Sequence, residues 1–375
     1  MNEHLRALFP IVQRAIYLNH AAVSPLPSLT IEAVERQLAD VRDHGSLHYK
    51  DWIAVKESAR QLAASMIGAK PEQIAFMRNT SDSISTIANG LRWRPGDNVV
   101  TFRHEFPSNV YPWRRIRDGF GVELRMCEER NGRVDLDELE GMIDSKTRVV
   151  SISHVQYASG FRADIERLGR AARVHDALLV VDVIQAMGAV PIDVNAELID
   201  AAAGAGHKWL LAPEGVGLLY LSERAQERIE PTLVGWISVS DPEDYDNFEQ
   251  EWKPGALAWE TGTGPASLIY GLEASLRLLC EVGIKRIAGH LNDLTDMLCE
   301  RLQGLNYEMV SSRLPGEKSQ IVCVKHKGGL SAVSLYAHLK QQNIITAPRG
   351  TRLRIAPHLY NNEDDIEALI AALPR

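Results

Sequence analysis

The chain has 375 residues, 45% of them hydrophobic, and a formal net charge of −8. This length allows a large core in two domains, or in one large and one small unit, and the acidic balance argues against a nucleic-acid partner. The opening MNEHLRALFP lacks a basic and apolar leader, and polar residues interrupt the longest apolar runs, so we expect a cytoplasmic protein without a membrane span.

Two helices are expected near the start of the chain. Apolar residues between Ile31 and Val41 recur at helical spacing, and Gly45 supplies a stop. A second helix is predicted over residues 51–67 and ends at Gly68.

Strand-like and helical runs alternate in the middle of the chain. The strand-like runs are NVVTF (98–102), GVELRM (121–126), RVVSISHV (148–155), LLVVDVI (178–184) and GVGLLYL (215–221). The helical runs between them include DLDELEGMI (135–143) and DIERLGRAARVHD (164–176). Such alternation predicts a largely parallel sheet covered by helices.

The pattern of predicted elements changes after WETGTGPASL (259–268). Long amphipathic helices are expected over about residues 272–305, followed by a strand (320–325), a helix (332–342), a strand (353–357) and a last helix (362–373). This order indicates a second, smaller α+β unit. The acidic stretch SDPEDYDNFEQE before it (240–251) is interpreted as a solvated loop.

No metal site is expected from the cysteines and histidines. The four cysteines are scattered without a C-x-x-C motif. His44 and His48 are four residues apart, a spacing that could hold a metal on a helix, but Gly45 breaks the helix and no third ligand is expected nearby.

Lys208 stands among glycine and apolar residues in GAGHKWLLAPEGVG. An ammonium in apolar surroundings loses hydration and its pKa falls. Asp182 closes the apolar strand LLVVD, and the lysine follows the next strand; ligands bind at the carboxyl ends of strands in such sheets. Taken singly, the lysine could be a surface residue, and the aspartate a helix cap or a ribose ligand.

Pyridoxal phosphate (PLP) needs both residue types, a lysine for its Schiff base and an acid for its pyridine nitrogen. It also needs a phosphate cradle, and Asn79, Thr80 and Ser81 stand where a strand gives way to a helix, although an ordinary helix cap would look the same. A nicotinamide-binding domain is disfavoured because no G-x-G-x-x-G follows a strand.

Eight segments stand in a characteristic order: YLNHAAVSPLP, RNTSDSI, HEFPSNVYPW, HVQYASG, VDVIQA, GAGHKWL, WETGTG and LRIAPHLYNNEDDI. Together they resemble the class V aminotransferases of PLP fold type I, a group that includes cysteine desulfurases, selenocysteine lyases and kynureninases. The resemblance covers nearly the whole chain. It implies an α/β fold, with a mainly parallel seven-stranded sheet in a large domain (residues 16–265) and a small α+β domain (266–375) on which residues 1–15 pack.

The resemblance also implies roles for single residues. Lys208 would bind the cofactor covalently, Asp182 would pair with the pyridine nitrogen, and Gln185 would hydrogen-bond the ring oxygen. Phosphate contacts would come from Thr80, Ser81 and His207, and from Thr263 of a neighbouring subunit, which implies a homodimer. Arg354 would bind the α-carboxylate of a free amino acid. His20 falls near the substrate entrance and could contact substrate or cap a turn.

Several positions depart from the desulfurase pattern. Phe106 stands where desulfurases place a histidine over the cofactor ring; it can stack but cannot transfer a proton. The loop ITAPRGTR lacks the nucleophilic cysteine, and Cys323 lies in an apolar strand pattern. Tyr157 replaces a family asparagine that contacts substrate. Arg349 and Arg352 lie in the loop ITAPRGTR and could bind a second carboxylate of the substrate.

We therefore expect an enzyme that acts at the α-carbon of a free amino acid, with transamination as the first reading and a C–S β-lyase as the second. Kynureninase-like hydrolysis, cysteine desulfuration and a non-catalytic PLP-binding protein are further alternatives. The motifs predict the cofactor but leave this choice open.

Overall fold

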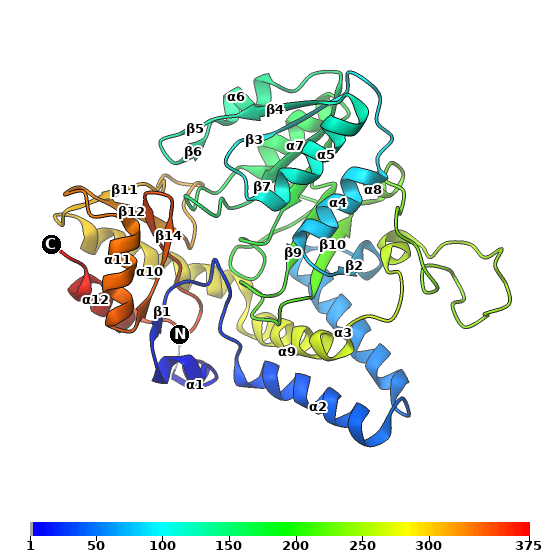
Figure 1. Cartoon of the computed structure of the whole chain (residues 1–375), viewed down its shortest axis with the longest axis horizontal. Helices are drawn as coiled ribbons and strands as arrows, with labels where there is room; N and C mark the ends of the chain where they lie inside the picture. The colour runs from blue at the N-terminus through cyan, green and yellow to red at the C-terminus, as the bar shows by residue number, and fades with distance from the viewer. Residues whose placement is uncertain (1–2) are drawn as a thin grey trace.

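A seven-stranded sheet forms the centre of the chain in a computed structural model that describes residues 3–375 (Figure 1). Its spatial order is β2-β10-β9-β8-β7-β3-β4, and every strand is parallel to its neighbours except β10, which is antiparallel to both β2 and β9. In that order the strands are Ile74–Met77, Gly217–Leu221, Ala201–Ala205, Leu178–Asp182, Thr147–Ser153, Asn98–Phe102 and Glu123–Cys127. The mainly parallel seven-stranded sheet expected from the sequence is confirmed.

Helices cover both faces of this sheet because its central strands are apolar on both sides. In β8, Leu179 and Val181 belong to one buried cluster, and Leu178 and Val180 to the cluster on the opposite face. The first cluster includes residues of α3 (Tyr49–Ile67), α7 (Ile165–Val174) and α9 (Ala266–Val282). The second includes residues of α4 (Thr80–Gly90) and α5 (Tyr111–Phe120).

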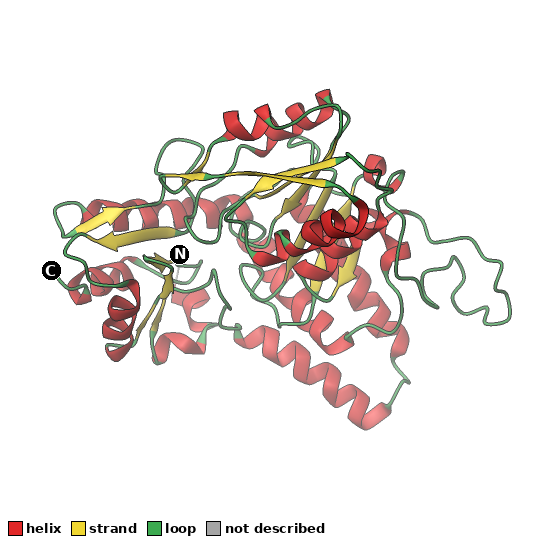
Figure 2. Cartoon of the chain, turned by 45° about the horizontal axis from the view of Figure 1, so that its top comes forward, coloured by secondary structure: helices red, strands yellow, loops and turns green. Residues whose placement is uncertain are grey.

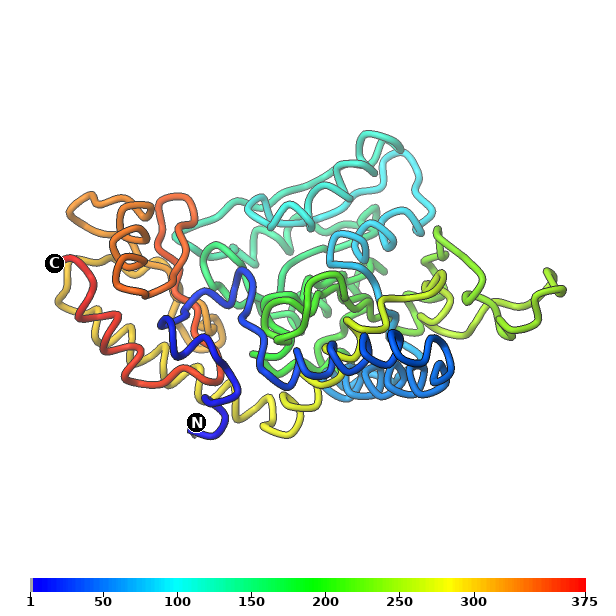
Figure 3. The backbone as a smooth tube through the Cα atoms, turned by 60° about the horizontal axis from the view of Figure 1, so that its bottom comes forward, coloured from blue at the N-terminus to red at the C-terminus, as the bar shows by residue number. Residues whose placement is uncertain are grey.

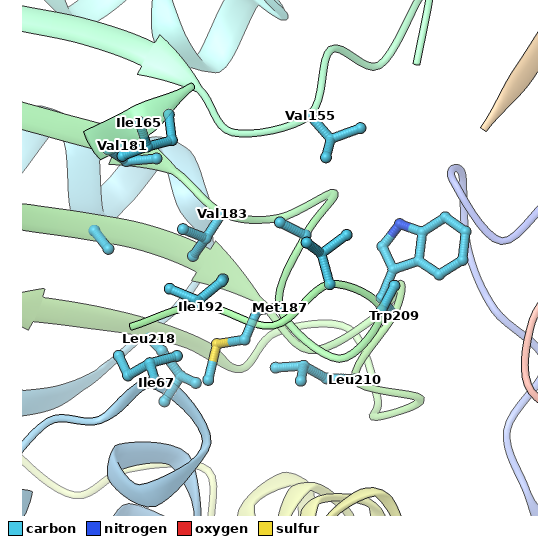
Figure 4. Packing of buried hydrophobic residues seen from close by; sticks show 14 of the residues in the cluster. Ile67, Val155, Ile165, Val181, Val183, Met187, Ile192, Trp209, Leu210 and Leu218 are labelled. Carbon is cyan, nitrogen blue, oxygen red and sulfur yellow. The ribbon is translucent and has the colours of Figure 1, made fainter. Parts of the chain in front are cut away.

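The first cluster continues beyond the carboxyl ends of the strands (Figure 4). Val181, Val183, Met187 and Ile192 carry it from β8 into the following loop, and the buried indole of Trp209 belongs to the same cluster. The loop that bears Lys208 is therefore anchored by packing immediately after that lysine.

A four-stranded sheet, β11-β12-β15-β14, and three helices make up the second unit (Figure 2). The strands, in that order, are Tyr307–Met309, Val322–His326, Arg352–Ile355 and Ala347–Arg349. The helices are α10 (Ile284–Leu302), α11 (Ala332–Gln341) and α12 (Glu363–Ala372). A buried cluster of its own, with Leu298, Val324 and Leu369 among its members, holds this unit together.

The N-terminal segment lies against this second unit (Figure 3). Strand β1 (Ile16–Tyr17) pairs in parallel with β13 (Ile344–Ile345), and Arg6 in α1 (Glu3–Ala7) forms an ion pair of 2.8 Å with Asp365. Residues 1 and 2, part of the segment expected to pack here, lie outside the described residues.

Most predicted elements are found close to the expected bounds. The helix expected from Ile31 is α2 (Ser28–His44) and stops at Gly45, whose φ is 60°. The long helical stretch is divided into α9 and α10 at Gly283, whose φ of 87° favours glycine. Helix α9 packs on α2 and α3 of the large unit, and the domain boundary at residue 265 stays a prediction.

Two further features complete the fold. Residues 230–254 form a long loop, here called the excursion, that projects at the right of Figure 1. It contains the acidic stretch, in which no helix or strand forms. No helix within residues 3–375 is long and apolar enough to cross a membrane.

Candidate active site

A cavity of about 280 Å³ lies beyond the carboxyl ends of the central strands. Asp182 is the last residue of β8, and Lys208 follows β9. Eight of the predicted site residues line this cavity: Thr80, Ser81, Phe106, Tyr157, Asp182, His207, Lys208 and Arg354. The fold thus brings together residues from six separate segments of the chain.

Lys208 is nearly buried, with 8% of its surface exposed. Burial lowers the pKa of this amine to about 8; Asp182 raises it, and the cations Arg354 and Arg349 lower it further. No carboxylate of residues 3–375 lies within 4 Å of its Nζ. A substantial fraction of Lys208 is therefore a neutral amine near pH 8, the form that attacks a carbonyl.

Asp182 is buried, and its Oδ1 accepts a hydrogen bond of 2.9 Å from the backbone N–H of Ile184. Burial raises the pKa of this carboxyl, and the nearby carboxyl of Glu105 adds to the rise. A cationic partner at the cavity side would restore the ionised form. The protonated nitrogen of a pyridine ring is such a partner.

Glu105 is a buried acid that the sequence did not single out. Its carboxylate accepts hydrogen bonds from the backbone N–H of Ser153 (2.7 Å) and from Nε2 of Gln156 (2.6 Å). Burial raises its pKa. These bonds connect the segment before Phe106 to the end of β7.

A phosphate cradle is present at the start of α4. Asn79 caps this helix by accepting a bond of 3.0 Å from the N–H of Asp82. The other amides of a first helical turn have no partner within the helix and suit an anion. Thr80 Oγ1 is buried and has no hydrogen-bond partner, which is costly unless a ligand supplies one. Ser81 donates to Ser108 at 2.6 Å, and both serines line the cavity with His207. These residues fit the phosphate of PLP.

Arg354 offers a buried guanidinium to the same cavity. It donates to the carbonyl oxygen of Tyr157 at 2.9 Å and to Asn19 Oδ1 at 3.2 Å, while its Nε has no partner. Burial lowers the pKa of this group, with Arg349 adding to the shift. No carboxylate of residues 3–375 pairs with it, so an anionic ligand would complete the site.

The two arginines of the loop ITAPRGTR differ. Arg352 forms an ion pair with Glu129, so it is not available to a second carboxylate. Arg349 lines the cavity.

Gln185 is buried close by, but both ends of its amide are engaged. Its Nε2 donates to the carbonyl oxygen of Ala21 at 3.0 Å, and its Oε1 accepts from Trp209 at 2.8 Å. One N–H of the amide remains for another acceptor. The expected contact with the cofactor stays a prediction.

The expectation that His20 contacts substrate finds no support in the structure. His20 is fully buried, with Nδ1 2.8 Å from the carbonyl oxygen of Ala356 and Nε2 2.9 Å from the hydroxyl of Tyr360. Because both ring nitrogens are engaged, this histidine joins the N-terminal segment to the second unit. The resemblance predicted that His20 lies near the substrate entrance, but the sequence does not show which contacts its ring makes.

Thr263 does not line the cavity of its own chain; it faces two other hollows beside the excursion 230–254. The segment that carries it is anchored by Glu260, whose Oε1 accepts from Arg60 Nη1 (2.7 Å) and from the N–H of Phe76 (2.9 Å). Lys56 forms an ion pair with the other oxygen.

No cysteine lines the cavity, and residues 3–375 include all four. Cys323 is fully buried in β12, where burial raises the pKa of its thiol to about 11. A thiol of this kind is a poor nucleophile.

Comparison with known proteins identifies the family of the chain. The family model for class-V aminotransferases matches residues 16–369. A probable cysteine desulfurase of Methanothermobacter thermautotrophicus is 30% identical over 394 residues, covering 98% of this chain and 96% of the relative. An uncharacterized aminotransferase of Bacillus subtilis is 26% identical over 98% of this chain and 96% of its own length.

Solved structures share the fold. The apo cysteine desulfurase of Thermococcus onnurineus superposes with a TM-score of 0.90 at 28% identity, covering 99% of this chain and 97% of that chain. A cystine C–S lyase, solved with cysteine persulfide, has a TM-score of 0.89 at 23% identity, covering 97% and 98% of the two chains. A mutant of that lyase was solved with glycine linked to its PLP cofactor.

The predicted cofactor, fold type and family are confirmed by these matches together with the cavity. The chain belongs to the class-V aminotransferase family and is a PLP-dependent enzyme.

Proposed function

We propose that this enzyme transfers the amino group of a free amino acid to an α-keto acid. PLP, when bound, supplies an electron sink for the electrons left at the substrate α-carbon. Arg354 binds the α-carboxylate, the neutral amine of Lys208 removes the α-proton and returns a proton, and Asp182 keeps the pyridine nitrogen protonated.

One observation carries this proposal: the cavity holds a partly neutral lysine but no cysteine. Sulfur transfer by a cysteine desulfurase runs through a thiol nucleophile, and Cys323 is buried in β12 with a raised pKa. Transamination needs only a base that takes the proton from the substrate α-carbon and would deliver a proton to the carbon of PLP that carries its aldehyde, which suits Lys208.

A C–S β-lyase is the second candidate. Elimination of a sulfur leaving group also uses Lys208 as its base and needs no cysteine. Tyr157 lines the same cavity, with its ring edge-on to Phe106 at 5.2 Å between centroids. In this second candidate its hydroxyl would be the proton donor for a departing thiolate.

The proposal includes a homodimer. Thr263 faces away from the cavity of its own chain, as a residue that serves a neighbouring subunit would. Large apolar side chains are exposed nearby on the excursion, including Trp236 and Phe248. Mixing Thr263→Ala and Lys208→Ala subunits tests this arrangement, because each mixed dimer would then contain one site with both defects and one site with neither.

Product analysis decides between the two candidates. The holoenzyme is incubated with single amino acids, including cysteine and cystine, and with an α-keto acid acceptor. Transamination predicts a new amino acid in a one-to-one ratio with the keto acid of the donor, without sulfide. Catalytic release of sulfide and pyruvate would establish the lyase instead, and full activity of Lys208→Ala would contradict both.

A further inference from the structure

Asp40, His44 and His48 lie together where α2 turns into α3, at the lower right of Figure 1. One ligand atom from each residue can be chosen such that all three lie within 4.8 Å of one another. The expectation that no third ligand lies near the two histidines is wrong. Asp40 supplies it from one helical turn before His44.

The turn itself brings His48 back to the helix. Gly45 ends α2 with φ 60°, and His48 stands immediately before the first residue of α3. The imidazoles of His44 and His48 lie 4.8 Å apart between ring centroids. The break in the helix, which in sequence argues against a shared site, therefore produces the convergence.

Asp40 Oδ1 is the common point of the cluster. It lies 3.0 Å from Nδ1 of His44 and 2.6 Å from Nδ1 of His48. The other oxygen, Oδ2, accepts a hydrogen bond of 2.7 Å from the indole N–H of Trp52. This bond orients the carboxylate, as the outer partners of metal ligands do.

We propose that Asp40, His44 and His48 bind a divalent first-row transition ion, zinc in the first instance. Ligand atoms on tetrahedral zinc lie about 3.3 Å apart when metal–ligand distances are about 2.0–2.1 Å. The two observed distances, 3.0 and 2.6 Å, are shorter, so the rings must move apart to admit the ion. The side chains of both histidines are about half exposed (48% and 46%), which leaves room for that rotation. Water fills the fourth position.

The choice of ion follows from the ligand types. Two imidazoles with one carboxylate suit zinc, copper or nickel. Magnesium and calcium prefer sets made of oxygen atoms, so they should bind weakly here. Bound zinc would tie the last turn of α2 to the first turn of α3.

Metal analysis of the PLP-loaded enzyme tests the site. After treatment with a chelator, the protein is dialysed against low micromolar zinc chloride, and bound zinc is counted per chain. We expect the His44→Ala/His48→Ala variant to bind one zinc fewer than the native chain. The control is His4→Ala/His338→Ala, which removes two exposed histidines elsewhere and should bind as the native chain does.

A milder variant guards against misfolding. Asp40→Asn keeps the shape of the side chain and removes its charge, and it should weaken zinc binding at least tenfold. Cobalt(II) should give the intense visible absorption of a tetrahedral site in the native chain and not in the double variant. Equal zinc content in the native chain and the double variant, or no zinc bound to the native chain, overturns the proposal.

Discussion

The Nζ atom of Lys208 lies over the face of the Phe106 ring, 5.5 Å from the ring centroid. The aromatic ring thus covers the amine that we propose as the attachment point of PLP, at the position where the resemblance places a histidine in desulfurases. Phe106 offers a stacking surface there and no proton.

Replacing Phe106 with leucine should weaken PLP binding by up to about tenfold, because an aromatic stacking contact contributes about 0.5–1.5 kcal/mol. Equilibrium dialysis of the apo-enzyme with PLP measures this change. Phe120→Leu, an exposed phenylalanine on α5, is the control and should bind PLP as the native chain does. If Phe106→Leu binds PLP with unchanged affinity, the ring of Phe106 does not contact the cofactor.

The pH dependence of cofactor loading should report the pKa of Lys208. Below its pKa of about 8 the lysine is protonated and cannot attack the aldehyde of PLP. The rate of reconstitution should therefore rise about tenfold per pH unit up to pH 8 and level off above it. A rate that keeps rising to pH 10 would mean that Lys208 titrates as an ordinary exposed lysine.

Arg354→Gln and Arg352→Gln form a matched pair on one strand. Arg354 has no carboxylate partner within residues 3–375, so it is free to pair with the substrate, and its loss should lower kcat/KM at least about 30-fold, given the 2–5 kcal/mol cost of breaking a buried charge pair. Its loss should not lower the free energy of unfolding, because a buried unpaired cation disappears. Arg352→Gln leaves Glu129 unpaired and should instead reduce stability. Steady-state kinetics and urea unfolding measure both effects.

Cys323→Ala should keep most of the catalytic activity. The thiol is buried in β12, and its raised pKa keeps it protonated at neutral pH. The expected cost is a small loss of stability, because Cys323 packs as a small hydrophobic residue. Activity assays on the native chain and the variant test this prediction. Loss of turnover in a folded Cys323→Ala protein would instead support a mechanism that uses the thiol.

Glu260→Gln should destabilise the fold by up to about 3–5 kcal/mol, because it removes the buried carboxylate that pairs with Lys56 and with the buried Arg60. Arg60 would keep only the half-exposed Glu57 as an ionised partner. The measurement is the free energy of unfolding in urea. Glu273→Gln, which removes a partner of exposed Arg277, should cost less than about 1 kcal/mol. Similar costs for both variants would contradict the anchoring role of Glu260.

The centre of the site was predictable because its residues sit at the ends of recognisable elements. Asp182 closes a strand of apolar residues, and Thr80 opens a helix with a capping asparagine before it. Lys208 is unusual for its surroundings in the sequence alone. These signals involve only neighbouring residues in the sequence, so they can be recognised without the tertiary structure.

The remaining features depend on tertiary contacts and side-chain orientations, which the spacing of residues along the sequence does not show. Strand β9 is AAAGA, residues of low strand propensity, so its place in the centre of the sheet is not evident from the sequence. At Gly204 the tertiary structure limits side-chain size, because a Cβ there would lie 3.3 Å from Val183. Glu105 shows its role only through bonds to Ser153 and Gln156, 48 and 51 residues away. His20 does not line the cavity, because Ala356 and Tyr360 hold its ring.

The pairing of β1 with β13 has a consequence for synthesis on the ribosome. All strands of the seven-stranded sheet lie between Ile74 and Leu221, and α9, which covers part of one face, ends at Val282, so this sheet can form and be covered before Ile344 is made. His20 and Tyr360, by contrast, are separated by 340 residues. The N-terminal segment therefore emerges first and finds its partners last, and a nascent chain halted before Ile344 should keep this segment open to proteases while its large sheet is already protected.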